Sequence, residues 1–371
     1  MATQYNADQV GSFLRPAAVK EARLKFRAGE IDQTTLAAAE DDAILTALEN
    51  QKRVGVDIYS DGEFRRSGFQ WDLMDAVEGY VATDLPVVNR MWQGGPSDEQ
   101  PVQQGTSEAV GARLKQMHRL TETQTAFLKR NAPGPFKMTL PSANQFPTLG
   151  FQKGLTDQFY KDRSELLWDI AGIIKSEVTA LVGEGVPYIQ IDAPRYAYYV
   201  DPKWRAHLVD LGEDPDRLLA EAVDADASCF DAASGSGALT ALHVCRGNNQ
   251  SMWYAQGGYG PIAEQLFGNI KVDRLLLEYD TERSGNFEPL AHVRPETTVV
   301  LGLVSTKDPA METEDNLLRR IDEASKYVPV ERLALSPQCG FASTLAGNAL
   351  TDDEQWRKLE LVVNTARKVW G

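Results

Sequence analysis

Short apolar runs rich in β-branched residues recur along the chain, each bounded by Gly, Pro or Asp. Runs of this kind are typical of strands that are buried on both faces of a parallel sheet. Seven are clear, at residues 56–60, 136–140, 188–192, 239–244, 274–278, 298–304 and 333–336. An eighth and weaker run lies at about residues 9–13. The pattern therefore predicts up to eight strands.

Segments with helical spacing separate these runs. They are rich in Ala, Glu, Leu, Lys and Arg, and they predict helices over residues 33–53, 157–183, 216–234 and 314–327. Eight alternating βα units favour a closed barrel over an open doubly wound sheet. The G-x-G-x-x-G turn of dinucleotide folds is also absent from the sequence. We therefore predict an α/β fold, with residues 1–371 forming a single catalytic (β/α)8 TIM-barrel domain.

One stretch fits neither a strand nor a helix. Residues 86–111, between the second and third predicted strands, are polar and contain several Gly, Pro and Gln. Long connections of this kind are uncommon in compact domains and usually serve a function. We expect this excursion to form a loop or lid.

The charge and composition argue against several classes of partner. The formal net charge is −15, so the surface repels phosphate backbones and anionic lipid head groups. The sequence has no run of about 18 apolar residues, and its first residues do not resemble a secretory signal. We expect no nucleic-acid or membrane partner, and a cytoplasmic location.

Polar residues that follow the strands of a barrel face its active site. His243 and Cys245 stand two apart at the end of one predicted strand, so both side chains point to the same face. Glu278 ends the next strand, and Cys339 follows the last one. Taken singly, such residues are often plain members of a core. Together, an imidazole, two thiols and a carboxylate suit tetrahedral zinc, so we predict a zinc site.

This set of ligands also indicates a type of chemistry. A free thiol has a pKa of about 8.5 and is mostly protonated at neutral pH, whereas zinc would hold it as a thiolate. Hydrolytic zinc sites more often use His and carboxylate ligands. The pattern therefore favours activation of a substrate thiol. The remaining cysteine, Cys229, lies in a predicted helix far from any strand end, and we interpret it as structural.

Six segments carry a family resemblance: VGSFLRP, GVDIYSDGEFRR, YIQIDAP, LHVCRGN, LLLEYD and LSPQCGF. In this order they resemble the C-terminal catalytic barrel of cobalamin-independent methionine synthase, and the short single-barrel proteins related to it. The resemblance covers nearly the whole chain. It implies a zinc-dependent thiol methyltransferase of methionine biosynthesis that methylates homocysteine. It also implies that the zinc ligands are His243, Cys245, Glu278 and Cys339.

The same resemblance assigns roles in substrate binding. Ser12 would hold the carboxylate of the substrate amino acid through its backbone and hydroxyl group. Glu63 and Asp192 would accept hydrogen bonds from the ammonium group. Two carboxylates suit a cation and backbone donors suit an anion, so the chemistry agrees with this division. Without the family, Glu63 and Asp192 could instead support neighbouring residues or cap helices.

The sequence departs from the family pattern in ways that concern the methyl donor. The family has a histidine after the seventh strand that assists protonation of the leaving pterin, and Lys307 stands at the matching place. A lysine can donate a proton, although its charge and reach differ, so Lys307 is the candidate catalytic residue. The chain matches only one of the two barrels of the full-length synthase. The donor is therefore left open between a methyltetrahydrofolate-like compound and a methylcorrinoid, the latter carried by a corrinoid protein.

Two other functions fit parts of this pattern. One is zinc-dependent alkyl transfer to another thiol, as in the coenzyme M epoxide transferases, where cations would have to bind a sulfonate. The other is a lyase resembling uroporphyrinogen decarboxylase, which would use the barrel without a metal. Glu63 and Asp192 favour an amino thiol as substrate. The arginines near the predicted strand ends, which would favour a sulfonate, are Arg65, Arg66, Arg195 and Arg246.

Overall fold

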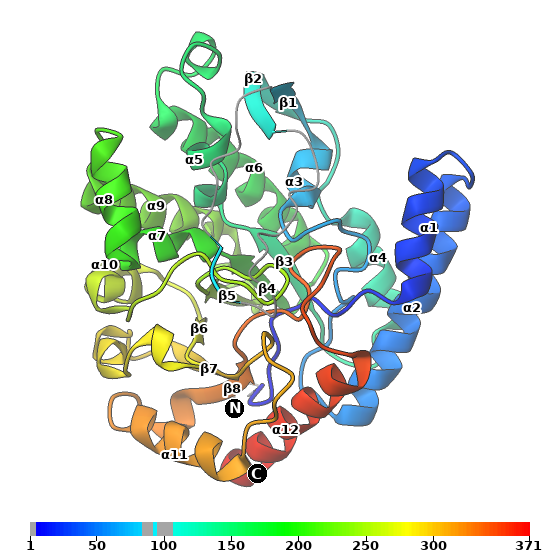
Figure 1. Ribbon diagram of the computed structural model, residues 1–371, viewed down its shortest axis with the longest axis vertical. Helices are drawn as coiled ribbons and strands as arrows, with labels where there is room; N and C mark the ends of the chain where they lie inside the picture. The colour runs from blue at the N-terminus through cyan, green and yellow to red at the C-terminus, as the bar shows by residue number, and fades with distance from the viewer. Residues whose placement is uncertain (1–4, 84–91, 95–106) are drawn as a thin grey trace.

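The computed structural model describes residues 5–83, 92–94 and 107–371. Its main sheet has six parallel strands, and each pairs with the next one along the chain. The strands curve around the centre of the molecule, and the helices lie outside them (Figure 1). The strands are β3 (Lys137–Pro141), β4 (Tyr188–Asp192), β5 (Leu239–Val244), β6 (Arg274–Glu278), β7 (Thr298–Val304) and β8 (Leu333–Pro337).

The first two strand positions of the barrel are filled by irregular segments. Ala7 forms a parallel bridge with Leu335 of β8, and Tyr59 forms one with Phe136, next to β3. The two segments are joined to each other by the amide of Asp57, which donates to the carbonyl of Ala7 at 3.1 Å. The ring of the (β/α)8 barrel therefore closes, as the sequence predicted.

The predicted strands at 9–13 and 56–60 are wrong as continuous strands, because single bridges replace their ladders. In these segments, side-chain oxygens accept hydrogen bonds from backbone amides that would otherwise donate to a neighbouring strand. The amide of Ala7 donates to Asp57 Oδ2 at 2.8 Å, and that of Ser60 to Gln51 Oε1 at 2.9 Å. Such local bonds compete with sheet formation.

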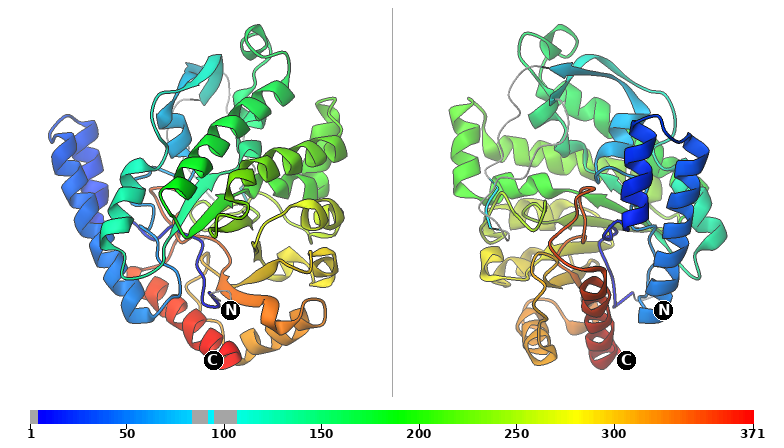
Figure 2. Two further views of the ribbon diagram at one scale, coloured as in Figure 1. Left: turned by 180° about the vertical axis from the view of Figure 1, so that it is seen from behind. Right: turned by 45° about the vertical axis from the view of Figure 1, so that its right-hand side comes forward.

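The described helices surround the sheet (Figure 2). Four of them, α2, α6, α9 and α11, lie close to the bounds that the sequence predicted. The helix predicted from residue 157 begins later, at Arg163, because the side chain of Asp162 caps it there. Contacts of α12 with α11 and α2 close the outer layer between the last and first units. The helices are α1 (Ala17–Arg27), α2 (Gln33–Val54), α3 (Trp71–Ala76), α4 (Glu122–Asn131), α5 (Pro147–Gly150), α6 (Arg163–Gly183), α7 (Ala197–Val200), α8 (Pro202–Asp210), α9 (Pro215–Cys229), α10 (Gly260–Asn269), α11 (Glu314–Ser325) and α12 (Asp352–Trp370).

The stretch between the second and third strand positions contains a hairpin that the sequence analysis missed. Strands β1 (Val77–Thr83) and β2 (Ser107–Gln116) pair antiparallel. Much of the predicted 86–111 excursion lies outside the described residues, and its last part, 107–111, belongs to β2. Within the excursion, Gln93 exchanges two backbone hydrogen bonds with Trp253, which lies in the loop after β5.

A small apolar cluster fills the inside of the barrel. Its buried members come from the two N-terminal segments and from five of the six strands, so they form a common interior layer. The members of the interior cluster are Tyr5, Val10, Ile58, Tyr188, Ala241, Leu276, Val300 and Ala334.

In the described part of the chain, no helix is long and apolar enough to span a membrane.

A buried ionic network anchors the N-terminal segment inside the barrel. Asp8 Oδ1 accepts a hydrogen bond from Lys137 Nζ at 2.6 Å, and Asp8 Oδ2 accepts one from Tyr188 Oη at 2.9 Å. Arg274 Nε lies 3.3 Å from the same carboxylate. Burial raises the pKa of Asp8, but the two cations outweigh it, so the net pKa is below its ordinary value. The network ties the first segment to β3, β4 and β6.

Candidate active site and metal centre

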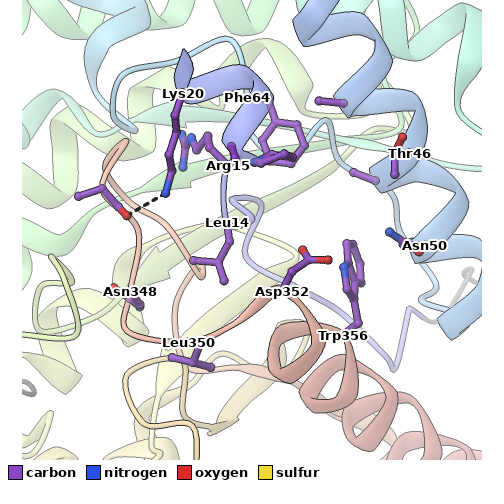
Figure 3. A pocket seen from close by; sticks show the side chains of 15 residues that line it. Leu14, Arg15, Lys20, Thr46, Asn50, Phe64, Asn348, Leu350, Asp352 and Trp356 are labelled. Atoms are coloured by element: carbon purple, nitrogen blue, oxygen red, sulfur yellow. Dashed lines mark hydrogen bonds between the residues drawn. The ribbon is translucent and has the colours of Figure 1, made fainter. Parts of the chain in front are cut away.

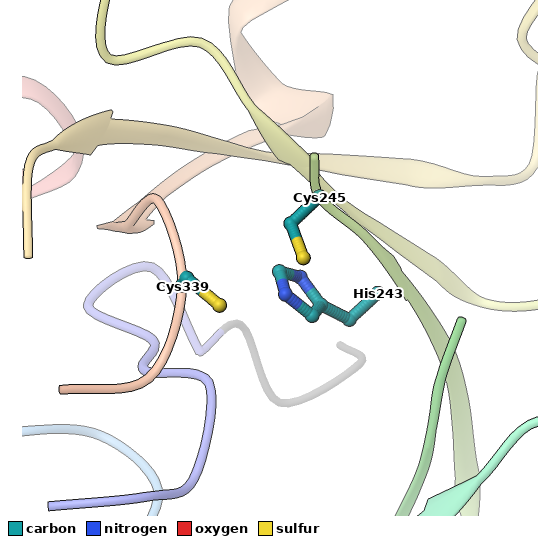
Figure 4. Close-up of side chains that lie close together, drawn as sticks. All are labelled: His243, Cys245 and Cys339. Carbon is teal, nitrogen blue, oxygen red and sulfur yellow. The ribbon is translucent and has the colours of Figure 1, made fainter. Parts of the chain in front are cut away.

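Three potential metal ligands converge where β5 and β8 end. A nitrogen of His243 and the Sγ atoms of Cys245 and Cys339 all lie within 4.8 Å of one another. All three residues are buried. His243 and Cys245 come from the end of β5, and Cys339 comes from the loop after β8 and points toward them (Figure 4). The alternation of side chains along β5 therefore brings a nitrogen and a sulfur to the same place.

His243 provides a test of whether this cluster suits a metal ion. Both of its ring nitrogens are buried and lack a well-aligned oxygen or nitrogen partner among the described residues, and the polar group nearest to the ring is the thiol of Cys339. Buried polar atoms without partners are costly, and a bound metal would satisfy one of them. An imidazole and two thiols are also typical zinc donors. The residues present therefore fit a zinc ion.

The two cysteines differ in their ionisation. A hydrogen bond with Cys245 and the neighbouring His243 imidazole lower the pKa of Cys339 well below that of an ordinary thiol. The same contact, together with burial, raises the pKa of Cys245. One thiolate is thus favoured even before a cation is added, which suits a site that holds a metal.

Glu278 lies at the end of β6, beside this group of three residues and not within it. Its Oε1 accepts a hydrogen bond from Arg283 Nη2 at 2.6 Å, and its Oε2 accepts one from the amide of Arg246 at 2.7 Å. Burial raises the pKa of Glu278, but Arg283 and Lys307 outweigh it and bring it to about 2. Glu278 is therefore a charged neighbour of the cluster and stays a predicted ligand.

Asp192 lies beside His243, because the two residues pair in register between β4 and β5. Gln190 Nε2 donates a hydrogen bond to Asp192 Oδ1 at 2.8 Å. Burial raises the pKa of Asp192 to about 7, although the neighbouring His243 lowers it and Glu63 raises it further. Two carboxylates thus share a buried space that would be stabilised by a cation.

Glu63 is the second of these carboxylates. Its Oε1 accepts a hydrogen bond from Thr139 Oγ1 at 3.0 Å, while its Oε2 is buried without a partner among the described residues. Its backbone has a φ of 58°, in the left-handed region that residues other than glycine seldom adopt. Such strain persists where the surrounding structure holds it, and it often marks a functional position.

Ser12 lies against the loop that carries Cys339. Its carbonyl accepts a hydrogen bond from the amide of Phe341 at 2.9 Å. A Cβ atom at Gly340 would come within 1.9 Å of Ser12 Oγ, so any larger residue there would displace the Ser12 hydroxyl. The structure therefore brings Ser12 next to the residue that follows Cys339.

Lys307 is buried in the same region, after β7. Its Nζ donates to the carbonyl of Gly247 at 2.9 Å and to Asn248 Oδ1 at 3.1 Å. Asn248 in turn donates to the carbonyl of Gly340 at 2.7 Å. The lysine therefore joins the loops that follow Cys245 and Cys339, and its charge lowers the pKa of Cys339.

Three residues of the site were missed by the sequence analysis. Gln190 could have been found, because it stands two residues before Asp192 on the same face of a strand. Asn248 lies in a loop and Arg283 in the short 3-10 helix Glu282–Ser284, and tertiary contacts set the paths of both segments, so no sequence spacing marks these residues. Arg283 also lies over the ring of Trp253, with its Cζ 4.4 Å from the centroid.

A separate pocket of about 440 Å³ lies between the start of α1, α2 and the start of α12 (Figure 3). It is lined by side chains such as Leu14, Phe64 and Trp356, and Lys20 donates to the carbonyl of Ala346 at 3.4 Å at its edge. None of the predicted ligands or substrate-binding residues lines it. We therefore place the candidate chemistry at the cluster of His243 and not in this pocket.

The barrel and the site at its strand ends define a class, that of methyltransferases like methionine synthase. The family model described as "Cobalamin-independent synthase, Catalytic domain" matches residues 5–368. The chain therefore belongs to this family, as the six sequence segments had indicated.

Known relatives align with this chain over most of the length of both proteins. The uncharacterized protein YxjG of Bacillus subtilis (strain 168) is 37% identical over 379 residues, with 99% of this chain and 95% of the relative covered. YxjH of the same strain is 35% identical over 373 residues, with the same coverage. A methionine synthase of Saccharolobus islandicus (strain Y.G.57.14 / Yellowstone #1) is 24% identical over 335 residues, covering 90% of this chain and 86% of that protein.

Solved structures support the fold. A Listeria monocytogenes protein named as a vitamin-B12-independent methionine synthase superimposes with a TM-score of 0.75 at 28% identity, covering 100% of this chain and 99% of that one. A B12-independent methionine synthase from Shewanella sp. W3-18-1 gives a TM-score of 0.73 at 19% identity, with 98% and 97% covered. The single-barrel fold that the sequence predicted is therefore confirmed.

Proposed function

We propose that the protein transfers a methyl group to the sulfur of homocysteine, in a zinc-dependent reaction with a methyltetrahydrofolate-like donor. The observation that carries this proposal is the buried group of His243, Cys245 and Cys339, whose ligand atoms lie within 4.8 Å of one another. The two unpartnered nitrogens of His243 support a metal at this place. Membership of the family supports homocysteine as the methyl acceptor.

His243, Cys245 and Cys339 would hold the zinc ion, and Glu278 is the proposed fourth ligand. When bound, zinc would lower the pKa of a substrate thiol that joined it and so supply a thiolate at neutral pH. Arg283 and the amide of Arg246 keep the Glu278 carboxylate charged and oriented. Because both of its oxygens already have donors, Glu278 would be the most weakly held of the four ligands.

The acidic pair would recognise the amino group of homocysteine. Glu63 has a buried oxygen without a partner, and Asp192 lies beside His243. An ammonium group between them would be bound by charge-assisted hydrogen bonds. Ser12, next to Gly340, would hold the carboxylate. These residues orient the sulfur toward the metal ligands, so the reaction gains from proximity.

Methyl transfer forms a sulfur–carbon bond and breaks the bond between the methyl group and the donor nitrogen. The electron pair of the broken bond stays on that nitrogen, which then needs a proton. Lys307 is the proposed donor of this proton, since its ammonium group is held at the same end of the barrel by Gly247 and Asn248. A methylcorrinoid donor has no support among the reported relatives, and a donor screen would compare the two.

The other two functions have weaker support. Of the arginines considered for a sulfonate, Arg65 pairs with Asp41 and Arg66 with Asp72. Arg246 donates to the carbonyls of Gly257 and Glu278. These three are therefore already occupied, whereas Arg195 is not, so it is the acidic pair of Glu63 and Asp192 that disfavours a sulfonate acceptor such as coenzyme M. Membership of the synthase family disfavours the metal-free lyase.

Replacing Cys339 tests the proposal directly. The substitution Cys339→Ser should lower the zinc content and the homocysteine methylation activity together, because one of the three converging ligands is lost. Cys229→Ala is the matched control. Cys229 is buried in α9, and its thiol donates a hydrogen bond to the carbonyl of Ala225 in the same helix at 3.3 Å. Zinc is measured by metal analysis and activity with several methyl donors. Full activity in a zinc-free Cys339→Ser protein would contradict the proposal.

A further inference from the structure

Arg195 is a buried arginine whose charge has no counterpart in the described structure. It lies in the turn after β4, three residues beyond Asp192, and none of its side chain is exposed. Only Nη2 forms a hydrogen bond, to the carbonyl of Gln145 at 3.4 Å. Its Nε and Nη1 are buried and have no partner among the described residues. The other buried arginines at this end of the barrel each have carboxylate or several carbonyl partners.

Three more buried polar atoms on residues that neighbour Arg195 lack hydrogen-bond partners in the part of the chain that the structure describes. They are two possible donors, Asn144 Nδ2 and Tyr198 Oη, and one acceptor, Gln145 Oε1. The guanidinium carbon of Arg195 lies 4.4 Å from the centroid of the Tyr198 ring, and that ring stacks on Trp204 with a centroid distance of 4.0 Å. Asn144 directly precedes Gln145, to which Arg195 donates. The guanidinium group of Arg195 thus lies over the Tyr198 ring, and Asn144 is the chain neighbour of the residue that accepts its one hydrogen bond.

A buried guanidinium without a counter-charge is destabilising, because burial removes its hydration and nothing replaces it. The aromatic ring of Tyr198 compensates only in part. A carboxylate would satisfy the free guanidinium nitrogens through paired hydrogen bonds, and the amide and hydroxyl could donate to the same group. We infer that Arg195, Asn144 and Tyr198 form an anion-binding subsite, and that it binds a carboxylate of the methyl donor.

The assignment to the donor rests on the proposed function and on position. The carboxylate of homocysteine already has a proposed place at Ser12, beside the β8 loop, whereas Arg195 follows β4. Three residues span at most about 11 Å, so Arg195 lies close enough to Asp192 for one bound molecule to reach both regions.

Calorimetry on the zinc-loaded protein tests this subsite without turnover. The acidic probe is N-(4-aminobenzoyl)-L-glutamate, and the neutral probe is 4-aminobenzamide. Arg195→Gln should weaken binding of the acidic probe at least tenfold while leaving the affinities for the neutral probe and for homocysteine unchanged. Arg195→Lys should give an intermediate loss, because it keeps the charge but not the paired donors. Arg319→Gln, an exposed arginine on α11, is the control and should change nothing.

Unchanged affinity for the acidic probe in Arg195→Gln would overturn the inference, and so would a selective loss of homocysteine binding, which would assign the subsite to the acceptor. If Arg195→Gln does not fold, Asn144→Asp is tested in its place. This substitution puts a carboxylate near Arg195, and it should weaken binding of the acidic probe because the two carboxylates compete for the guanidinium group. Because probe binding needs no reaction, a selective effect of Arg195 would stand even if methyl transfer to homocysteine were not found.

Discussion

Glu63 combines backbone strain with a carboxylate oxygen that has no hydrogen-bond partner among the described residues. Its φ of 58° costs of the order of 1 kcal/mol or more for a residue that is not glycine. The neighbouring Arg66 lies 3.7 Å from Oε1, while Oε2 has no partner within the described residues. A side chain held at such a cost, with an oxygen free, is suited to binding a cation that arrives from outside.

Glu63→Gln should therefore weaken homocysteine binding selectively. The amide keeps the size of the side chain and can still accept from Thr139, but it loses the charge that attracts the ammonium group. Loss of one charge-assisted hydrogen bond is worth about 1.5–3 kcal/mol, or about 10- to 150-fold in affinity. Calorimetry with homocysteine and the KM for homocysteine measure this. Glu323→Gln on the surface of α11 serves as the control, and equal affinities of Glu63→Gln and wild type would refute the role.

For single residues, the sequence predicted the positions that depend only on the geometry of the strands. His243, Cys245 and Asp192 stand at the ends of buried strands, where alternation determines their direction. Arg283 could not be predicted, because it reaches Glu278 from a short 3-10 helix whose position depends on contacts such as the one with Trp253. The unpartnered state of Arg195 is likewise a property of the packed structure and not of its sequence neighbours.

Among the elements, α9 supports the loop after β3 through a buried carboxylate. Asp226 accepts hydrogen bonds from Ser142 Oγ at 2.7 Å, Tyr196 Oη at 2.9 Å and the amide of Ala143 at 3.1 Å. Burial raises the pKa of Asp226 to about 6, although these hydrogen bonds oppose the rise. The carboxylate therefore links α9 to the loops that follow β3 and β4, which carry Asn144 and Arg195.

This carboxylate should make stability depend on pH in a defined direction. The folded-state pKa of about 6 lies above the unfolded value of about 3.9, so the unfolded chain loses its proton first as pH rises. The contribution of Asp226 to the free energy of unfolding is fully present below about pH 4, and it falls by about 3 kcal/mol by pH 7. Urea unfolding of wild type and Asp226→Asn at several pH values measures it. The two stabilities should diverge over this range in favour of the variant, and parallel curves would show that Asp226 does not titrate in this way.

The elements were predictable where burial leaves a simple pattern. Strands β4, β5, β6 and β7 have the predicted bounds, because both faces are covered and the runs are continuous and apolar. The N-terminal segments were not, since polar residues such as Asp57 and Gln51 replace ladder bonds there. The hairpin β1–β2 was missed because its strands contain glycine and exposed polar residues that do not alternate cleanly.

For the whole molecule, closure of the barrel depends on the N-terminal segment, which makes few backbone bonds with its neighbours. The buried network of Asp8 with Lys137, Tyr188 and Arg274 compensates, because it joins this segment to three strands. The (β/α)8 fold was predictable from the count of βα units, but this network was not, since its members lie up to 266 residues apart, from Asp8 to Arg274.

Asp8→Asn should therefore destabilise the entire fold. Lys137 and Arg274 would stay buried without their carboxylate partner, a change that typically costs about 3–5 kcal/mol. Chemical denaturation measures the loss. Asp353→Asn, which removes an exposed ion pair on α12, should leave stability nearly unchanged. Equal stability of Asp8→Asn and wild type would mean that the N-terminal segment is held by its apolar contacts instead.

We propose that His243, Cys245 and Cys339 would hold a zinc ion and that the thiol of homocysteine would join it. X-ray absorption at the zinc edge, recorded on the zinc-loaded protein with and without homocysteine, distinguishes this arrangement from a site that homocysteine does not reach. We predict two sulfur ligands at about 2.3 Å without the amino acid and three after it is added. A sulfur count that stays the same on addition of saturating homocysteine, or a zinc ion without sulfur ligands, would rule out this cluster as the zinc site that binds the substrate thiol.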